Sequence, residues 1–126
     1  MNIPDNLKYT KDHEWIKVDG NSAVIGITDY AQGELGDVVF VDIDSDIQNV
    51  TKSETFGTIE AVKTVSDLYA PCSGKVLELN PLLSDEPQTI NTDPYGEGWL
   101  IKIEIENLDD LNDLLDGNAY KKLIGQ

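Results

Sequence analysis

Short runs of β-branched and aromatic residues, separated by turn formers, constrain the fold of this chain more than any other feature. Glu14–Val18 and Ser22–Ile27 are two such runs, and the Asp-Gly pair between them is typical of a hairpin turn. The same pattern predicts further strands at Asp37–Ile43, Phe56–Val62, Thr64–Ala70, Gly74–Asn80 and Trp99–Ile105. So many short strands in 126 residues indicate a mainly β fold.

Helices are predicted at only a few places. Thr28 is a candidate N-cap for a short helix that Gly36 would end. Residues 81–98 are rich in proline and glycine, so we expect a long ordered loop there. The tail has leucines at the spacing of a short amphipathic helix, Leu108, Leu111, Leu114 and Leu115. Residues 118–125 would form a second helix, and with no linker in the sequence we expect one domain, 1–126.

The charge balance excludes two classes of partner. The net charge of −15 leaves no basic stripe to neutralise the phosphates of a nucleic acid, and it disfavours an anionic membrane surface. Cys72 is the single cysteine, so neither an internal disulfide nor a CxxC motif can form. No apolar run suits a signal peptide or a membrane span, and we therefore expect a cytoplasmic bacterial protein.

The sequence offers little for an independent catalytic site. His13 is the only histidine, Cys72 is the only cysteine, and there is no glycine-rich phosphate-binding loop. Acids are abundant, so a pair of carboxylates in a pocket stays open. We expect no catalytic activity of the chain's own. We also expect His13 to be structural and Cys72 to be a small buried hydrophobe.

Lys63 is the strongest candidate in the chain for a site of chemical modification. It lies between the predicted strands 56–62 and 64–70, at a hairpin tip that a second enzyme could enclose without unfolding the strands. The hexapeptides that begin at Gly36 and Gly74 resemble one another, and two such half-units would form a small two-sheet sandwich with the lysine between them. On spacing alone, the alternative of an ordinary solvated lysine stays open.

Several long motifs resemble one known family. "EAVK", followed by "SD" and "YAPCSGKVLELN", is similar to the lipoylation segment of the glycine cleavage system H proteins. "LKYTKDHEW", "IGITDYAQGELGDVVFVDI" and "INTDPYGEGWLIKI" also resemble that family, in order and over nearly the whole chain. Ala61 stands where the family usually has serine, and Cys72 where an aliphatic residue is common. Biotin carriers flank their lysine with methionines, and the lipoyl domains of 2-oxoacid dehydrogenases lack the "HEW" and "PYGEGW" motifs.

The resemblance implies a lipoyl/biotinyl-carrier-like sandwich of two sheets with short helices, including C-terminal ones. It implies a non-catalytic carrier with lipoate bound covalently to Lys63 as N6-lipoyl-lysine. The expected partners are glycine decarboxylase (P-protein), which loads the aminomethyl group of glycine, and the folate-dependent aminomethyltransferase (T-protein), which removes it. Dihydrolipoamide dehydrogenase (L-protein) would reoxidise the dihydrolipoyl arm. A lipoate ligase or a lipoyl/octanoyl transferase would attach the lipoyl group.

The resemblance also assigns roles to further side chains. Glu14 would pair with the amine of the loaded cargo and Asp67 would lie near the cleft, so both would protect the intermediate. Glu60, Val62 and Thr64 would be recognised by the lipoylating enzyme. Two alternatives remain, namely a lipoyl-relay protein that donates lipoyl to other acceptors and an interaction module that is never modified.

Overall fold

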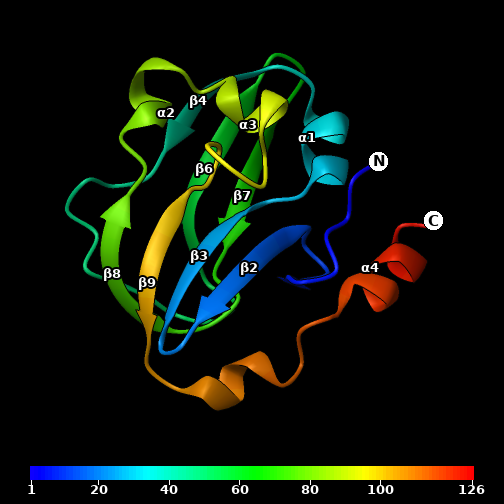
Figure 1. Cartoon of the computed structure of the whole chain (residues 1–126). Helices are drawn as coiled ribbons and strands as arrows, with labels where there is room; N and C mark the ends of the chain where they lie inside the picture. Colours follow the sequence, from blue (N-terminus) through cyan, green and yellow to red (C-terminus); the bar gives the residue numbers. More distant parts are fainter.

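Two antiparallel sheets dominate the computed structural model, which describes residues 1–126 (Figure 1). One sheet has the strand order β1-β2-β3-β9-β8-β5, and the other has the order β4-β6-β7. The strands are β1 Lys8–Tyr9, β2 Glu14–Asp19, β3 Ser22–Ile27, β4 Val38–Asp42, β5 Asn49–Val50, β6 Thr55–Ala61, β7 Val65–Tyr69, β8 Gly74–Leu79 and β9 Ile101–Ile105. The predicted mainly β fold of two sheets with short helices is confirmed. β1 and β5 were not predicted, because two residues are too short to show an alternating pattern.

The predicted hairpin of β2 and β3 is confirmed. Asp19 pairs with Ser22, and Gly20 in the turn has a φ of 62°, which glycine adopts without a steric penalty. At the other end of the hairpin, Glu14 pairs with Ile27. The first residue of β2 therefore lies beside the start of the helix that follows β3.

Helix α1, Asp29–Leu35, has the predicted caps. The Thr28 hydroxyl accepts a hydrogen bond from the Ala31 N–H at 3.1 Å, and Gly36 ends the helix with a φ of 79°. The backbone N–H of Gly36 still donates to the carbonyl of Gln32. A residue with a side chain would be strained at this φ, so glycine lets the chain turn directly from α1 into β4.

The segment 81–98 is ordered, as expected, but it contains two helices of one turn. These are α2, Leu82–Asp85, and α3, Thr89–Thr92. The side chain of Asn80 fixes both ends of the segment, because its Nδ2 donates to the carbonyls of Glu97 and Trp99. This segment lies at the end of the molecule where α1 ends (Figure 1).

The tail differs from the prediction at its first helix. Leu108–Leu111 form η1, a single turn of 3₁₀ helix rather than an amphipathic α-helix. The Asn107 side chain caps this turn by accepting from the Asp109 N–H, and the chain then extends to pair Leu115 with Tyr9 as an isolated bridge. The second predicted helix is confirmed as α4, Gly117–Leu123.

Two hydrophobic clusters form the interior. The larger one lies between the sheets and includes Ile25 and Ile103 of one sheet and Ile59 of the other, with Cys72 buried as expected. The smaller one includes Tyr9, Trp15 and Tyr120, and its two tyrosine rings stack with their centroids 4.7 Å apart. Every helix of the structure is too short or too polar to cross a membrane.

Candidate functional site

The turn between β6 and β7 presents Lys63 to solvent. The Ala61 N–H donates to the Thr64 carbonyl at 2.8 Å and closes the turn. The Val62 N–H donates to the Asp37 carbonyl at 3.0 Å, which ties the turn to the segment before β4. The Lys63 ammonium makes no hydrogen bond or ion pair.

Gly36 supports the side chain of Lys63. A Cβ on this glycine would lie 3.3 Å from Lys63 Cε, so the aliphatic stem passes close over the backbone at the end of α1. Asn91 of α3 holds that backbone in place. Its Nδ2 donates to the Gly36 carbonyl, its Oδ1 accepts from the Val38 N–H, and both distances are 2.9 Å. Sequence reasoning missed Asn91, because nothing in the sequence distinguishes it from any other loop asparagine.

Apolar side chains surround the predicted recognition residues on the outer face of the small sheet. The register places Phe40 beside Glu60, and Glu60 beside Val65, in one row across β4, β6 and β7. Phe40 is 51% exposed, and Val62 of the turn is 72% exposed. Exposed apolar side chains that lie close together on a surface are typical of a site that contacts another protein.

A groove of about 240 Å³ lies between the free edge of β7, helix α1 and the residues before β2. Its apolar walls come from α1, from β7 and from one strand of each sheet behind them, namely β3 and β6. They include Ala31, Leu35, Leu68, Ile27 and Ile59. Leu35 immediately precedes Gly36, so this end of the groove is next to the stem of Lys63.

The carboxyl group of Glu14 is the buried polar end of this groove. Glu14 is only 2% exposed, although a glutamate side chain in water is charged at neutral pH. The Thr10 hydroxyl donates to Oε1 at 2.9 Å, and the Tyr69 backbone N–H donates to Oε2 at 3.1 Å. Burial raises the pKa of Glu14 to about 8, which the two hydrogen bonds only partly offset. The group is therefore protonated at neutral pH.

Asp67 lines the same groove in a different environment. It is exposed, and its Oδ2 accepts a long hydrogen bond of 3.4 Å from the Tyr69 hydroxyl. Tyr69 thus contacts both predicted acids, one through its backbone and one through its phenol. Sequence reasoning named Glu14 and Asp67 but missed Thr10 and Tyr69, because a backbone donor leaves no signal in the residue type.

His13 also lines the groove, but it is held in place by structural contacts. Its Nδ1 lies 2.9 Å from the Tyr120 hydroxyl, and its ring packs on Tyr30 with the centroids 4.9 Å apart. Burial lowers the pKa of His13, so the ring is neutral at physiological pH. Its backbone φ of 68° shapes the tight bend that leads into β2.

Comparison with known proteins assigns the chain to one family. The family model for the glycine cleavage H-protein matches residues 7–126. Among curated relatives, the glycine cleavage system H proteins of Bacteroides fragilis and Chlorobium limicola are 54% and 55% identical, over 98% and 100% of both chains. The crystal structure of an H protein from Mycobacterium marinum has a TM-score of 0.90 and 40% identity, covering 98% of this chain and 100% of that one. The chain belongs to the glycine cleavage H-protein family.

Proposed function

We propose that this chain is the lipoyl-bearing carrier of a glycine cleavage system. It would take the aminomethyl group of glycine from the decarboxylase to the folate-dependent aminomethyltransferase, and then present dihydrolipoyl to dihydrolipoamide dehydrogenase. The observation that carries the proposal is the placement of a free lysine, Lys63, at one end of a groove that contains a buried carboxyl, Glu14. Family membership supports it. The partners perform the chemistry, and this chain binds and shields the cargo.

The residues around Lys63 fit a lipoyl group. Lipoate joined to Nζ in amide linkage would supply a dithiolane that accepts and releases the cargo. Amide formation removes the charge of the lysine, which suits a long apolar extension of its stem. The groove that begins at Leu35 has apolar walls against which such an extension can pack. Because the tether keeps the cargo near the same protein surface, successive enzymes meet it at a high effective concentration.

Glu14 would hold the ammonium group of the cargo. An opposite charge favours the ionised carboxylate, so arrival of the cation would remove the proton from Glu14. The resulting pair would lie in a site with little water, where it is stronger than a pair on the surface. Thr10 and Tyr69 would keep the two carboxylate oxygens oriented. Asp67 would add a negative charge at the exposed side of the groove, where solvent weakens it.

This buried carboxyl favours a cargo carrier over a lipoyl relay. A protein that only donates its lipoyl group needs the exposed turn but has no use for a carboxyl that is costly to bury. We also propose that residues 1–126 form one lipoyl-carrier domain. Since the relatives are bacterial, we place it in the bacterial cytoplasm.

The enzyme that attaches the lipoyl group would recognise Glu60, Val62 and Thr64. All three are exposed around the lysine, and Phe40 extends the same surface onto β4. A lipoate ligase or a lipoyl/octanoyl transferase could therefore contact an apolar surface with a single acid at its centre. Such a contact would select this lysine among the nine basic residues of the chain.

Intact mass and peptide mapping test the proposal after the chain is incubated with lipoate, ATP and a lipoate ligase. We expect one lipoyl increment, confined to the peptide that contains Lys63. Lys63→Arg should abolish the increment, whereas Lys75→Arg, at an exposed lysine of β8, should leave it unchanged. A chain that stays unmodified while a known H protein is lipoylated in the same reaction would contradict the proposal.

A further inference from the structure

A segment of the acidic tail closes the molecule behind Glu14. Residues 107–115, here called the strap, contain η1 and connect β9 to the last helix. Leu111 and Leu114 of the strap pack against the large hydrophobic cluster, and Leu115 packs against the small one. The strap is thus anchored on both clusters by apolar contacts, although most of its residues are polar.

Glu14 lies between two cavities. Besides the groove, it lines a second cavity of about 230 Å³, here called the rear cavity. Thr10, Lys52, Ala70 and Asp113 line the rear cavity as well. The strap supplies one wall, so its position decides how much water can approach the carboxyl from behind.

One end of the strap is joined to the segment that holds Glu14 Oε1. Leu115 and Tyr9 exchange both of their backbone hydrogen bonds, each at 2.8 Å. The next residue after Tyr9 is Thr10, whose hydroxyl donates to the buried carboxyl. A shift of this end of the strap would therefore move the first donor.

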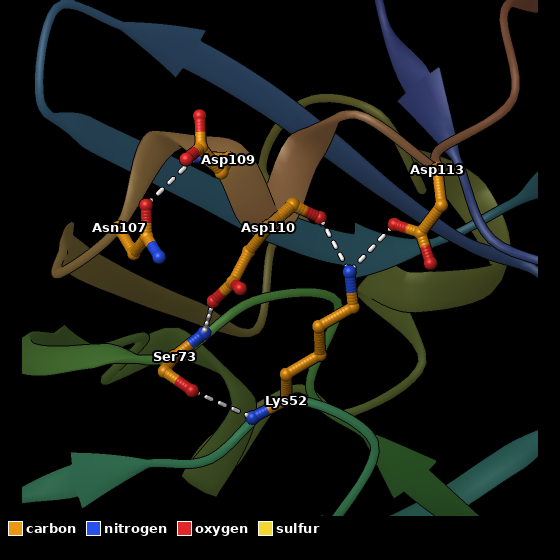
Figure 2. Close-up of polar contacts among 6 residues, drawn as sticks. All are labelled: Lys52, Ser73, Asn107, Asp109, Asp110 and Asp113. Carbon is orange, nitrogen blue, oxygen red and sulfur yellow. Dashed lines mark hydrogen bonds and ion pairs between the residues drawn. The ribbon is translucent and has the colours of Figure 1, made fainter.

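The middle of the strap is joined to the segment that holds Glu14 Oε2. Figure 2 shows the Lys52 ammonium between the strap's Asp110 carbonyl, at 2.6 Å, and the Asp113 carboxylate, at 2.5 Å. The backbone of Lys52 also pairs with that of Ala70 as an isolated β-bridge, and Ala70 directly follows Tyr69. The Tyr69 N–H is the second donor to the buried carboxyl. The strap thus connects the two segments that hold the carboxyl.

Ser73, which directly precedes β8, reinforces this connection (Figure 2). Its hydroxyl accepts from the Lys52 N–H at 2.9 Å, and its own N–H donates to Asp110 Oδ2 at 3.0 Å. Lys52 and Asp110 are therefore linked twice, directly and through Ser73. Such a network is more rigid than an isolated surface ion pair.

We propose, on the basis of the function given above, that Lys52 is a positioning residue for Glu14. By tying the strap at Asp110 and Asp113, it keeps the rear cavity narrow and keeps both donors aligned on the carboxyl. The loaded cargo then meets a carboxylate that is fixed in place and reached by little water. Lys52 acts through the strap and does not itself touch the cargo.

The direction in which the pKa of Glu14 changes separates this proposal from a simple effect of charge. The charged groups that line the groove and the rear cavity are Lys11, Lys52, Asp12, Glu34, Asp67 and Asp113, with the neutral His13 beside them. Removing the cation in Lys52→Met would, through charge alone, raise the pKa of Glu14. Opening the strap would admit water and lower that pKa even if both donors moved away, because burial raises the pKa of Glu14 by more than the two hydrogen bonds lower it. In Asp113→Asn, the loss of a negative charge and the opening of the strap would both lower the pKa of Glu14.

The experiment uses the full chain without lipoate, labelled with ¹³C at the glutamate side-chain carboxyl. The signal of Glu14 is identified as the one that disappears in Glu14→Gln, and its titration is followed by NMR. We expect the midpoint to fall by about one pH unit in both Lys52→Met and Asp113→Asn. Lys52→Arg should restore the wild-type titration, because a guanidinium can make both contacts. Lys102→Met, which removes the exposed Lys102–Glu78 pair, is the matched control.

A second readout links the strap to the cargo. Lipoylated and aminomethyl-loaded chain should lose its cargo several-fold faster in Lys52→Met than in wild type, while lipoylation proceeds at the normal rate. A Glu14 midpoint that rises or stays unchanged in Lys52→Met would overturn the proposal, as would an unchanged rate of cargo loss. The titration is measured without lipoate, so failure of the carrier function would be recognised separately, as wild-type chain that cannot be loaded.

Discussion

The Lys63 turn and the Glu14 site are built in opposite ways. The turn residues Val62, Lys63 and Thr64 are exposed, and two backbone hydrogen bonds hold them. Glu14 is almost fully buried, and both of its carboxyl oxygens accept hydrogen bonds. Under the proposed function, a modifying enzyme would have to reach the first region, whereas water would have to be kept from the second. One chain would then separate the place where a group is attached from the place where its cargo is protected.

The buried carboxyl should have the largest effect on stability, and the effect should depend on pH. Because the folded pKa of Glu14 is about 8, the folded state retains its proton where the unfolded state has lost it. Wild type should therefore lose stability as the pH rises from about 5 to 8, relative to Glu14→Gln, whose amide does not titrate. We expect the free energy of unfolding of Glu14→Gln to exceed that of wild type by up to about 5 kcal/mol at pH 9.

Urea unfolding of both chains from pH 4 to pH 9 measures this difference. The two curves should converge near pH 4, where the carboxyl is protonated in both states. A difference that stays constant with pH would mean that the pKa of Glu14 is not raised, and the contrast between the two regions would lose its electrostatic basis.

A substitution that disturbs the packing beside Glu14 should change the free energy of unfolding almost as much. A Cβ on Gly26 would lie 2.6 Å from the indole ring of Trp15, its partner across β2 and β3. Gly26→Ala should cost about 3 kcal/mol of the free energy of unfolding, because the buried ring cannot move aside. Gly33→Ala, on α1 with open space around it, should gain about 0.5 kcal/mol. Equal denaturation midpoints for the two variants would contradict the packing described here.

Sequence reasoning reached the exposed region more easily than the buried one. The turn and the hairpins have local signals, so the sequence directly indicated Gly36 as a helix end, the two strands that flank Lys63, and Lys63 as a candidate site. Glu14 was named only through family resemblance, because no local pattern shows that an acid will be buried. Its partners Thr10 and Tyr69 lie on segments that only the tertiary fold brings together.

The tail shows a second limit of sequence reasoning. Its leucine spacing predicts an α-helix, but the Asn107 cap and the bond from the Ser73 N–H to the Asp110 side chain favour one turn of 3₁₀ helix. Leu115 then leaves the helical path to pair with Tyr9. Short polar segments follow their tertiary contacts more closely than their hydrophobic spacing.

The smallest effect on stability should come from the turn itself. Val62 is 72% exposed, so Val62→Ser should change the free energy of unfolding by less than about 0.5 kcal/mol. The same variant should lower the kcat/KM of lipoylation several-fold, because the ligase loses an apolar contact. Val18→Ser, at an exposed valine of β2, is the matched control and should leave lipoylation unchanged. Normal lipoylation of Val62→Ser would remove Val62 from the recognition surface.

The division between attachment and protection is tested most directly by the rate at which loaded chain loses its aminomethyl group at neutral pH. Intact mass spectrometry over time would compare wild type, Glu14→Gln and Asp67→Asn after equal lipoylation and loading. Loss should be about tenfold faster in Glu14→Gln, equivalent to about 1.4 kcal/mol, and less than about twofold faster in Asp67→Asn. A Glu14→Gln chain that keeps its cargo as long as wild type would contradict the protective role of the buried carboxyl.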